Sequence, residues 1–364
     1  MALFNGTMAI IGLVESGGFA QMSTDGWRWV FYFNAIFFAL SAALIAIVYN
    51  PPPPKLRREL SAISAAASVD FIGLALLLIG VILLVVGLTW GGSVYAWKSP
   101  HVITTIVVGG FGLVAFGLYE TYGCSDGIID HRFLEHRNFL LILSVAFVDG
   151  MLLYGVNAFY PVEVTGIFTS NLLKANLYLL PLNIFVLVGC FGAAAFLGRL
   201  KHYRTFLVVT LAVLSLFLGL LILVTPSRPA MADIFTGVIG LCTGVTTVIP
   251  PVILSYSVPS HLLGTSETVL AATRGLGGTI GITIFASVFG NAMKANLPTG
   301  VAKAAVEAGL PTTSVKQFIE ALLGGVGSLT DVKGATAAVI GAAVSAIKTI
   351  TAQSFHGVWM SVAP

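Results

Sequence analysis

An aspartate in the middle of a long apolar segment is the residue of this sequence that most clearly could do chemistry. Asp149 lies within the apolar stretch 138–160, and a carboxylate inside a membrane span is costly unless it faces protein or water or carries a proton. At about 100° per residue, Asn157 and Tyr160 share a sector of roughly 80° with Asp149. One helix face is therefore predicted to present a carboxylate, an amide and a phenol to a proton or substrate cavity. A buried polar packing pair is the alternative.

Two further charged residues lie in apolar stretches. Arg274 lies in the first part of the stretch 269–291, two turns after Glu267, which is too far for a direct bond. The pattern from Gly277 to Gly281 permits close helix approach, so helix packing competes with a cavity-lining role for Arg274. Glu15 lies in the stretch 2–20, where coupling to protons and pairing inside the bundle are equally consistent with its position.

Two predicted helices carry prolines that should kink them and free backbone carbonyl groups. Such broken helices often line the substrate sites of transporters. The first contains Asn183 two residues after Pro181. In the second, four residues lie on one stripe of the helix. Their side chains either line a cavity or form hydrogen bonds with the backbone of their own helix. The four are Thr236, Thr243, Thr247 and Pro250.

A short basic segment and two histidines complete the set of candidate residues. Gly198, Arg199, Lys201 and Arg204 lie in a basic loop, which fits the plain positive charge of a cytoplasmic loop. His131 and His136 are five residues apart rather than the four that share a helix face, so no metal site is expected. We also expect no cofactor. No HExxH, HxxxH or GxSxG string occurs, which argues against a membrane-embedded enzyme.

The elements that hold these residues are predicted to be membrane-spanning helices. Of the 364 residues, 57% are hydrophobic and 9% charged, whereas soluble domains carry roughly 25% charged residues. A net charge of +3 and three scattered cysteines argue against a nucleic-acid partner and a disulfide scaffold. The fold class is therefore an all-α polytopic membrane protein. Its predicted spans cover residues 2–20, 30–48, 70–89, 102–120, 138–160, 175–197, 205–224, 233–255 and 269–291.

Basic residues orient these spans. Alternate short loops carry eight Lys and Arg on one side and four on the other, which places the richer side in the cytoplasm. We expect an outer loop over 292–351 with a short surface helix after Thr312, and an interfacial helix over 334–347. A tenth span begins at Ala352, but the 13 residues to Pro364 are too few to cross a bilayer.

Several strings of this sequence stand out, and they are 26–34 (GWRWVFYFN), 70–73 (DFIG), 90–97 (WGGSVYAW), 198–204 (GRLKHYR), 263–265 (LGT) and 274–281 (RGLGGTIG). Together they resemble fungal major facilitator transporters, specifically the trichothecene-efflux-pump-like members of the fourteen-span drug:proton antiporter branch. The first string lies between the fifth and sixth spans of that family. The resemblance implies a gating role for the basic loop that contains Gly198, Arg199, Lys201 and Arg204, as the alternative to plain positive charge.

The resemblance implies a partial major facilitator bundle. Residues 1–50 then hold the last two spans of the N-terminal bundle, 51–69 a proline-rich basic linker, and 70–121 two linker spans. A cytoplasmic loop follows over 122–137, and 138–364 form the C-terminal bundle with an incomplete last span. Family spans one to four have no counterpart, and the fifth-span motif is degenerate, since residues 12–18 read GLVESGG without a proline.

The resemblance also implies the function. It predicts proton-coupled efflux of toxin-like or drug-like molecules, with the lipid bilayer, protons and a small amphipathic substrate as partners and no partner protein. The plasma membrane is the expected location, with a vacuolar or vesicular membrane as the alternative. Two other functions stay open, which are proton-coupled uptake of iron–siderophore chelates and a truncated remnant that transports nothing.

Overall fold

The computed structural model describes residues 2–23, 25–50, 70–92, 94–123, 137–196, 203–226, 228–258, 262–324 and 332–361. Over these ranges the chain is helical, and the only β-pairing is an isolated bridge between Gly91 and Tyr95. The helices are α1 (Ala2–Met22), α2 (Gly26–Val48), α4 (Phe71–Trp90), α5 (Pro100–Leu118), α7 (Arg137–Ile167), α8 (Leu172–Leu177), α9 (Leu180–Phe196), α10 (Tyr203–Leu220), α11 (Pro229–Ser257), α12 (Leu263–Glu307), α13 (Val315–Gly324) and α14 (Ala337–Met360).

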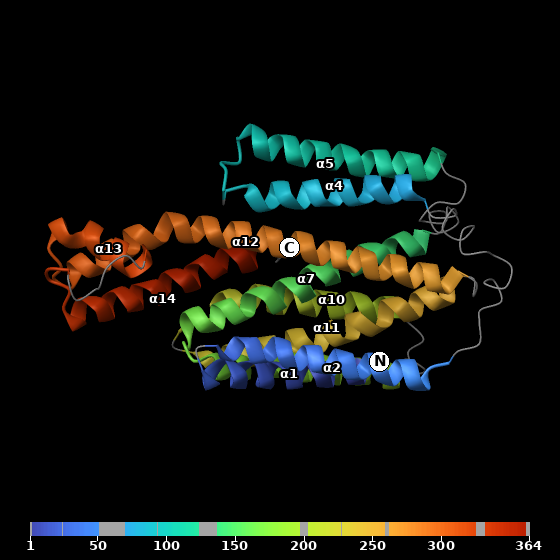
Figure 1. The fold of residues 1–364 in the computed structure, drawn as a ribbon, viewed down its shortest axis with the longest axis horizontal. Helices are drawn as coiled ribbons and strands as arrows, with labels where there is room; N and C mark the ends of the chain where they lie inside the picture. Colours follow the sequence, from blue (N-terminus) through green and yellow to red (C-terminus); the bar gives the residue numbers. More distant parts are fainter. Residues whose placement is uncertain are drawn as a thin grey trace.

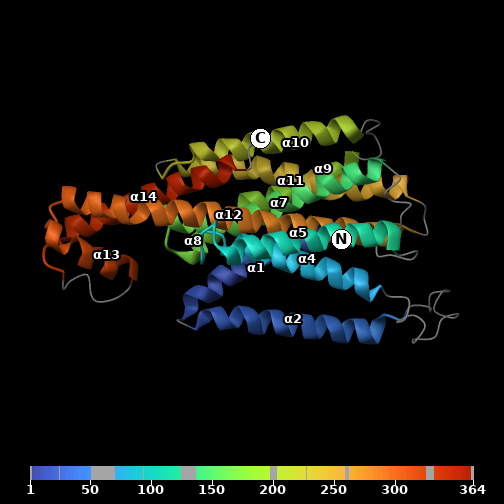
Figure 2. The same cartoon turned by 90° about the horizontal axis from the view of Figure 1, so that it is seen from above.

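The helices form an elongated bundle in which α7, α9, α10, α11 and α12 run side by side (Figure 1). The most extensive contacts join α7 to α12 and α9 to α11. The α4–α5 hairpin packs against α12, and α1 packs against α8 and α9. Helix α2 lies at the edge of the bundle beside α1 (Figure 2). Nine helices of the described residues are long and apolar enough to cross a membrane. Helix α1 is not among these nine, although the span 2–20 was expected there.

The positions of the helix ends agree with the prediction, made from the basic residues, that successive loops alternate between the two sides of the membrane. The end of α2 and the starts of α4 and α7 lie at one end of the bundle (Figure 1), and the end of α9 and the start of α10 lie at the same end (Figure 2). Most of the predicted cytoplasmic segments, 51–69 and 124–136 among them, lie outside the described residues. We call this end the inner end and the opposite one the outer end, following the sequence-based orientation.

The region 292–351 differs from the loop that was expected there. Helix α12 continues past residue 291 to Glu307, and together with α13 and the first half of α14 it encloses a small apolar core of its own. The buried residues of this core are Val301, Ala305, Leu310, Phe318, Ala321, Val332, Val339 and Ala343. The surface helix predicted after Thr312 is confirmed as a 3-10 turn followed by α13.

The helix expected over 334–347 and the tenth span expected from Ala352 are one continuous helix, α14. Thr336 caps its first turn by accepting a hydrogen bond from the Val339 amide, and no break follows because residues 337–360 contain no proline. Thr351 meets Gly166, near the outer end of α7, so the part of α14 beside α7 runs from about Thr351 to Met360. At about 1.5 Å per residue that part covers about half of a bilayer.

Glycines allow two helix pairs to approach closely. A Cβ atom on Gly277 of α12 would clash with the Phe147 carbonyl oxygen of α7, and one on Gly150 of α7 would clash with the Arg274 carbonyl oxygen. On α9, a Cβ on Gly189 would clash with the Leu241 carbonyl oxygen of α11. The packing role predicted for the segment from Gly277 to Gly281 is therefore seen in the structure.

Gly277→Ala is expected to destabilise the chain by about 1–3 kcal/mol, because the added methyl group has to push the backbones of α7 and α12 apart. Gly275→Ala is the matched control, since a Cβ at Gly275 has no atom within 4 Å and alanine favours a helix. The midpoint of thermal unfolding in detergent measures both. Equal midpoints for the two variants would show that the crossing tolerates a side chain.

Candidate functional site

Asp149 is paired with Arg274 in the interior of the bundle. Asp149 is 1% exposed, and its Oδ2 atom forms a salt bridge with the Nη2 atom of Arg274. The Thr246 hydroxyl donates a hydrogen bond to the Oδ1 atom of Asp149. Arg274 also donates to the Thr247 hydroxyl oxygen at 2.7 Å. The charge that was expensive in hydrocarbon is thus compensated by groups from α11 and α12.

The pair lies where the backbones of α7 and α12 approach closely. Gly150 follows Asp149 directly and contacts the backbone of Arg274 itself. A larger residue at this position would separate the helices, and the guanidinium group would no longer reach the carboxylate. The small residues and the ion pair therefore act together, since the first permits the approach that the second requires.

Arg274 keeps some freedom that Asp149 lacks. Its side chain is 20% exposed in the salt bridge, and its Nε atom has no hydrogen-bond partner among the described residues. A guanidinium group offers five donor hydrogens, so this arrangement leaves capacity for another acceptor.

The structure separates the three side chains that were expected to share one face of α7. Tyr160 is fully buried, whereas Asn157 is exposed and donates to its own Leu153 carbonyl oxygen at 2.7 Å. Asp149 and Tyr160 are thus buried in the bundle, and the Asn157 amide does not join them there. That the three side chains serve one proton or substrate cavity stays a prediction.

The polar residues of α9 and α11 mostly bond their own helices. Thr243 is buried and donates to the Ile239 carbonyl oxygen at 2.8 Å, and the partly buried Asn183 donates to the Leu179 carbonyl oxygen at 3.0 Å. Helix α11 stays helical through the buried Pro250. Of the predicted cavity residues on α11, Thr247 is the one that reaches the ion pair, since it donates to the Thr243 carbonyl oxygen and accepts from Arg274.

Glu15 is half-buried on α1, and its Oε1 atom has no hydrogen-bond partner among the described residues. It lies on a different helix from the Asp149–Arg274 pair and takes no part in it. Of the predicted gating residues, Gly198, Arg199 and Lys201 lie outside the described residues. Arg204 is described, and it is exposed at the start of α10.

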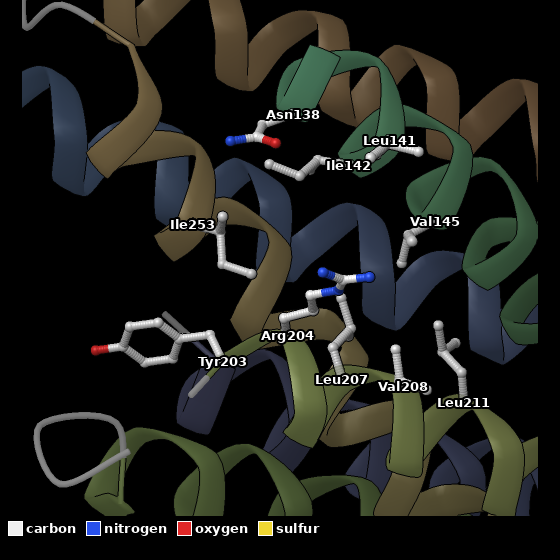
Figure 3. A pocket seen from close by; sticks show the side chains of 10 residues that line it. All are labelled: Asn138, Leu141, Ile142, Val145, Tyr203, Arg204, Leu207, Val208, Leu211 and Ile253. Atoms are coloured by element: carbon white, nitrogen blue, oxygen red, sulfur yellow. The ribbon is translucent and has the colours of Figure 1, made fainter. Parts of the chain in front are cut away.

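Arg204 reaches into a cavity of about 610 Å³ near the inner end of the bundle. Figure 3 shows its guanidinium group directed from α10 toward Ile142 and Val145 of α7. The other lining residues are Asn138, Leu141, Tyr203, Leu207, Val208, Leu211 and Ile253. A second cavity of about 440 Å³ shares Leu141, Val145 and Leu211 with the first. Arg204 was singled out from the sequence as part of the basic loop, but the cavity itself was not predicted, because most of its lining consists of ordinary apolar residues.

Sequence reasoning also missed Glu163 and Thr246. The predicted span ended at residue 160, which left Glu163 outside the membrane, whereas α7 continues to Ile167 and buries Glu163 to 2% exposure. Thr246 was passed over because it falls outside the stripe formed by Thr243, Thr247 and Pro250. An acid three residues past a predicted span end was the available signal for Glu163.

Comparison with known proteins identifies the family. Residues 6–363 match the model of the fungal trichothecene efflux pump family. A trichothecene efflux pump of Fusarium sporotrichioides is 28% identical over 308 residues, which cover 82% of this chain and 51% of that protein. One from Trichoderma arundinaceum is 29% identical over 272 residues, covering 72% of this chain and 45% of that protein.

A third relative is the major-facilitator-type transporter of the acurin A biosynthesis cluster of Aspergillus aculeatus. It is 27% identical over 286 residues, which cover 77% of this chain and 50% of that protein. This chain thus spans about half the length of the relatives it matches. The matched region includes α7, α11 and α12, which hold the Asp149–Arg274 pair. The chain belongs to the fungal trichothecene efflux pump family of membrane transporters.

Proposed function

We propose that this chain works in the export of toxin-like small molecules across a membrane, and that the Asp149–Arg274 pair couples export to protons. The observation that carries the proposal is an ion pair buried where α7, α11 and α12 meet, in a member of a family of efflux pumps. Intramembrane acids of this kind mark proton or substrate paths.

The proposed coupling follows from the contacts of the pair. With Asp149 ionised, its attraction to Arg274 holds α7 and α12 together at their crossing. A proton on Asp149 removes that attraction. The carboxylic acid still forms a hydrogen bond with the Thr246 hydroxyl, because a hydroxyl group can both donate and accept hydrogen bonds. The substrate binds to the ionised pair through donor hydrogens of Arg274 that the pair does not use, and it is released when Asp149 takes up a proton. Proton and substrate thus favour different states, which is the requirement for antiport.

We also propose where the protein works. Helices α2, α4 and α5 expose large apolar side chains such as Phe38, Ile47, Phe71 and Phe111, which suit contact with lipid tails. The plasma membrane is the location we propose, because an exporter that protects a cell has to move its substrate outside. The proposed partners are the lipid bilayer, protons and one small amphipathic substrate.

The test is expression of the tagged chain in a yeast strain that lacks its own drug pumps. We expect lower accumulation of a labelled trichothecene than in cells with an empty vector, and restored accumulation when a protonophore collapses the proton gradient. Labelled ferric siderophore is supplied in a parallel arm. Siderophore uptake without trichothecene export would overturn the direction of transport. Unchanged accumulation of both compounds, with the chain found in the membrane, would overturn transport by this chain.

A further inference from the structure

A second acid is buried on α7, and it has no cationic partner among the described residues. Glu163 is 2% exposed, and its Oε2 atom accepts a hydrogen bond from the Trp359 indole nitrogen of α14 at 3.2 Å. No Lys, Arg or His forms a salt bridge with it in the part of the chain that the structure describes. This distinguishes Glu163 from Asp149, whose charge is matched by Arg274.

Tyr160 lies one turn before Glu163 on α7 and is completely buried. Its hydroxyl lies near Glu163, Asp233 and Tyr178, and near the hydroxyl of Thr236. The Oδ1 atom of Asp233 is buried without a hydrogen-bond partner in the described part of the chain. On α14, His356 lies three residues before Trp359.

Such a cluster is unfavourable when its carboxyl groups are ionised. A buried carboxylate without a cation loses its hydration with nothing in return. A single bound proton removes one charge and supplies a hydrogen-bond donor to the cluster. The Oδ1 atom of Asp233, which meets no partner among the described residues, is a second sign that a hydrogen-bond donor is missing there.

The cluster is separate from the Asp149–Arg274 pair. Glu163 lies fourteen residues after Asp149 on α7, or about 21 Å along the helix, and only four residues before its outer end at Ile167. Buried apolar side chains fill the space between the two sites, among them Leu152, Val156 and Phe285. A proton held at Glu163 is therefore close to the outer surface, whereas Asp149 lies deep in the bundle.

We propose that Tyr160, Glu163 and Asp233 form a second proton-binding site at the outer end, with Glu163 as the acceptor. The Glu163 carboxylate takes one proton from water and becomes a carboxylic acid, and the same proton returns to water on release. Trp359 positions the carboxyl group through its indole N–H. The inference depends on these contacts alone and holds whichever substrate the chain carries.

Infrared spectroscopy of the purified chain in lipid vesicles tests the proposal without a transport assay. We expect a carbonyl-stretch band of a buried carboxylic acid that disappears on raising the pH of the medium. Glu163→Gln should remove this band. Glu320→Gln, at an exposed glutamate paired with Lys316, and Asp149→Asn should both leave it in place. A band that persists in Glu163→Gln, or no such band in the unmodified chain, would overturn the proposal.

Trp359→Phe provides a second measurement, which keeps the carboxyl group and removes its donor. The band should move to higher frequency, because a carboxylic acid carbonyl that loses a hydrogen bond has a stiffer C=O bond. An unchanged frequency would overturn the assignment to Glu163 even if Glu163→Gln fails to fold. A lost band in Glu163→Gln together with failed trichothecene export by the unmodified chain would reject the proposed function and leave the second proton site standing.

Discussion

Asp149→Asn is expected to abolish proton-coupled export while the chain still inserts and folds. Asparagine has the size of aspartate and accepts the Thr246 hydrogen bond, but it neither binds a proton nor attracts Arg274. Breaking a buried pair changes free energies by about 3–5 kcal/mol. A bias of about 3 kcal/mol between two states changes their ratio more than about a hundredfold. The measurement is the initial rate of trichothecene export under an imposed proton gradient.

The matched control is Asp25→Asn, which removes an exposed acid. Asp25 pairs with Arg28 at 3.5 Å near the start of α2, and both side chains are more than half exposed, so export should be unchanged. If the Asp149→Asn variant exports at the normal rate with its dependence on the proton gradient intact, Asp149 has no part in coupling.

Arg274→Ala is expected to destabilise the folded chain by about 3–5 kcal/mol, because it leaves the Asp149 carboxylate buried without a cation. Asp149 is 1% exposed, so water cannot replace the lost partner. The loss is measured as a drop in the midpoint of thermal unfolding in detergent, at a pH where the carboxylate is ionised.

A double variant separates the charge from the packing in this result. Adding Asp149→Asn to Arg274→Ala removes the orphaned charge, so most of the lost stability should return. Arg28→Ala is the exposed control and should cost about 1 kcal/mol or less. Equal instability of the single and double variants would mean that Arg274 stabilises the bundle by packing rather than by pairing.

The helices were predictable because each needs a run of apolar residues as long as the bilayer is thick. Their ends were not, since α7 continues past Pro161 and the charged Glu163 to Ile167, and α12 continues through Pro298 to Glu307. A proline or a charge ends a span in sequence-based reasoning. In the bundle, Trp359 provides a polar partner for Glu163 and lets the helix go on.

The candidate site was only partly predictable. Asp149 was identified because a charged side chain inside a membrane span is unfavourable in free energy. The local sequence alone shows that Asp149 is in this position. Its pairing with Arg274 depends on two helices far apart in the chain crossing at Gly150 and Gly277. The glycines of α12 predicted close packing, but not which helix would pack there. The partner of a buried charge is thus decided by the tertiary fold.

The most direct test of the proposed coupling is to measure protons as substrate binds. A pH-sensitive dye in weakly buffered detergent solution reports proton release by the purified chain when a trichothecene is added. Antiport through Asp149 predicts release of a proton by the unmodified chain and none by the Asp149→Asn variant. Equal proton release by both, or binding of the trichothecene without any release, would contradict the assignment of Asp149 as the coupling residue.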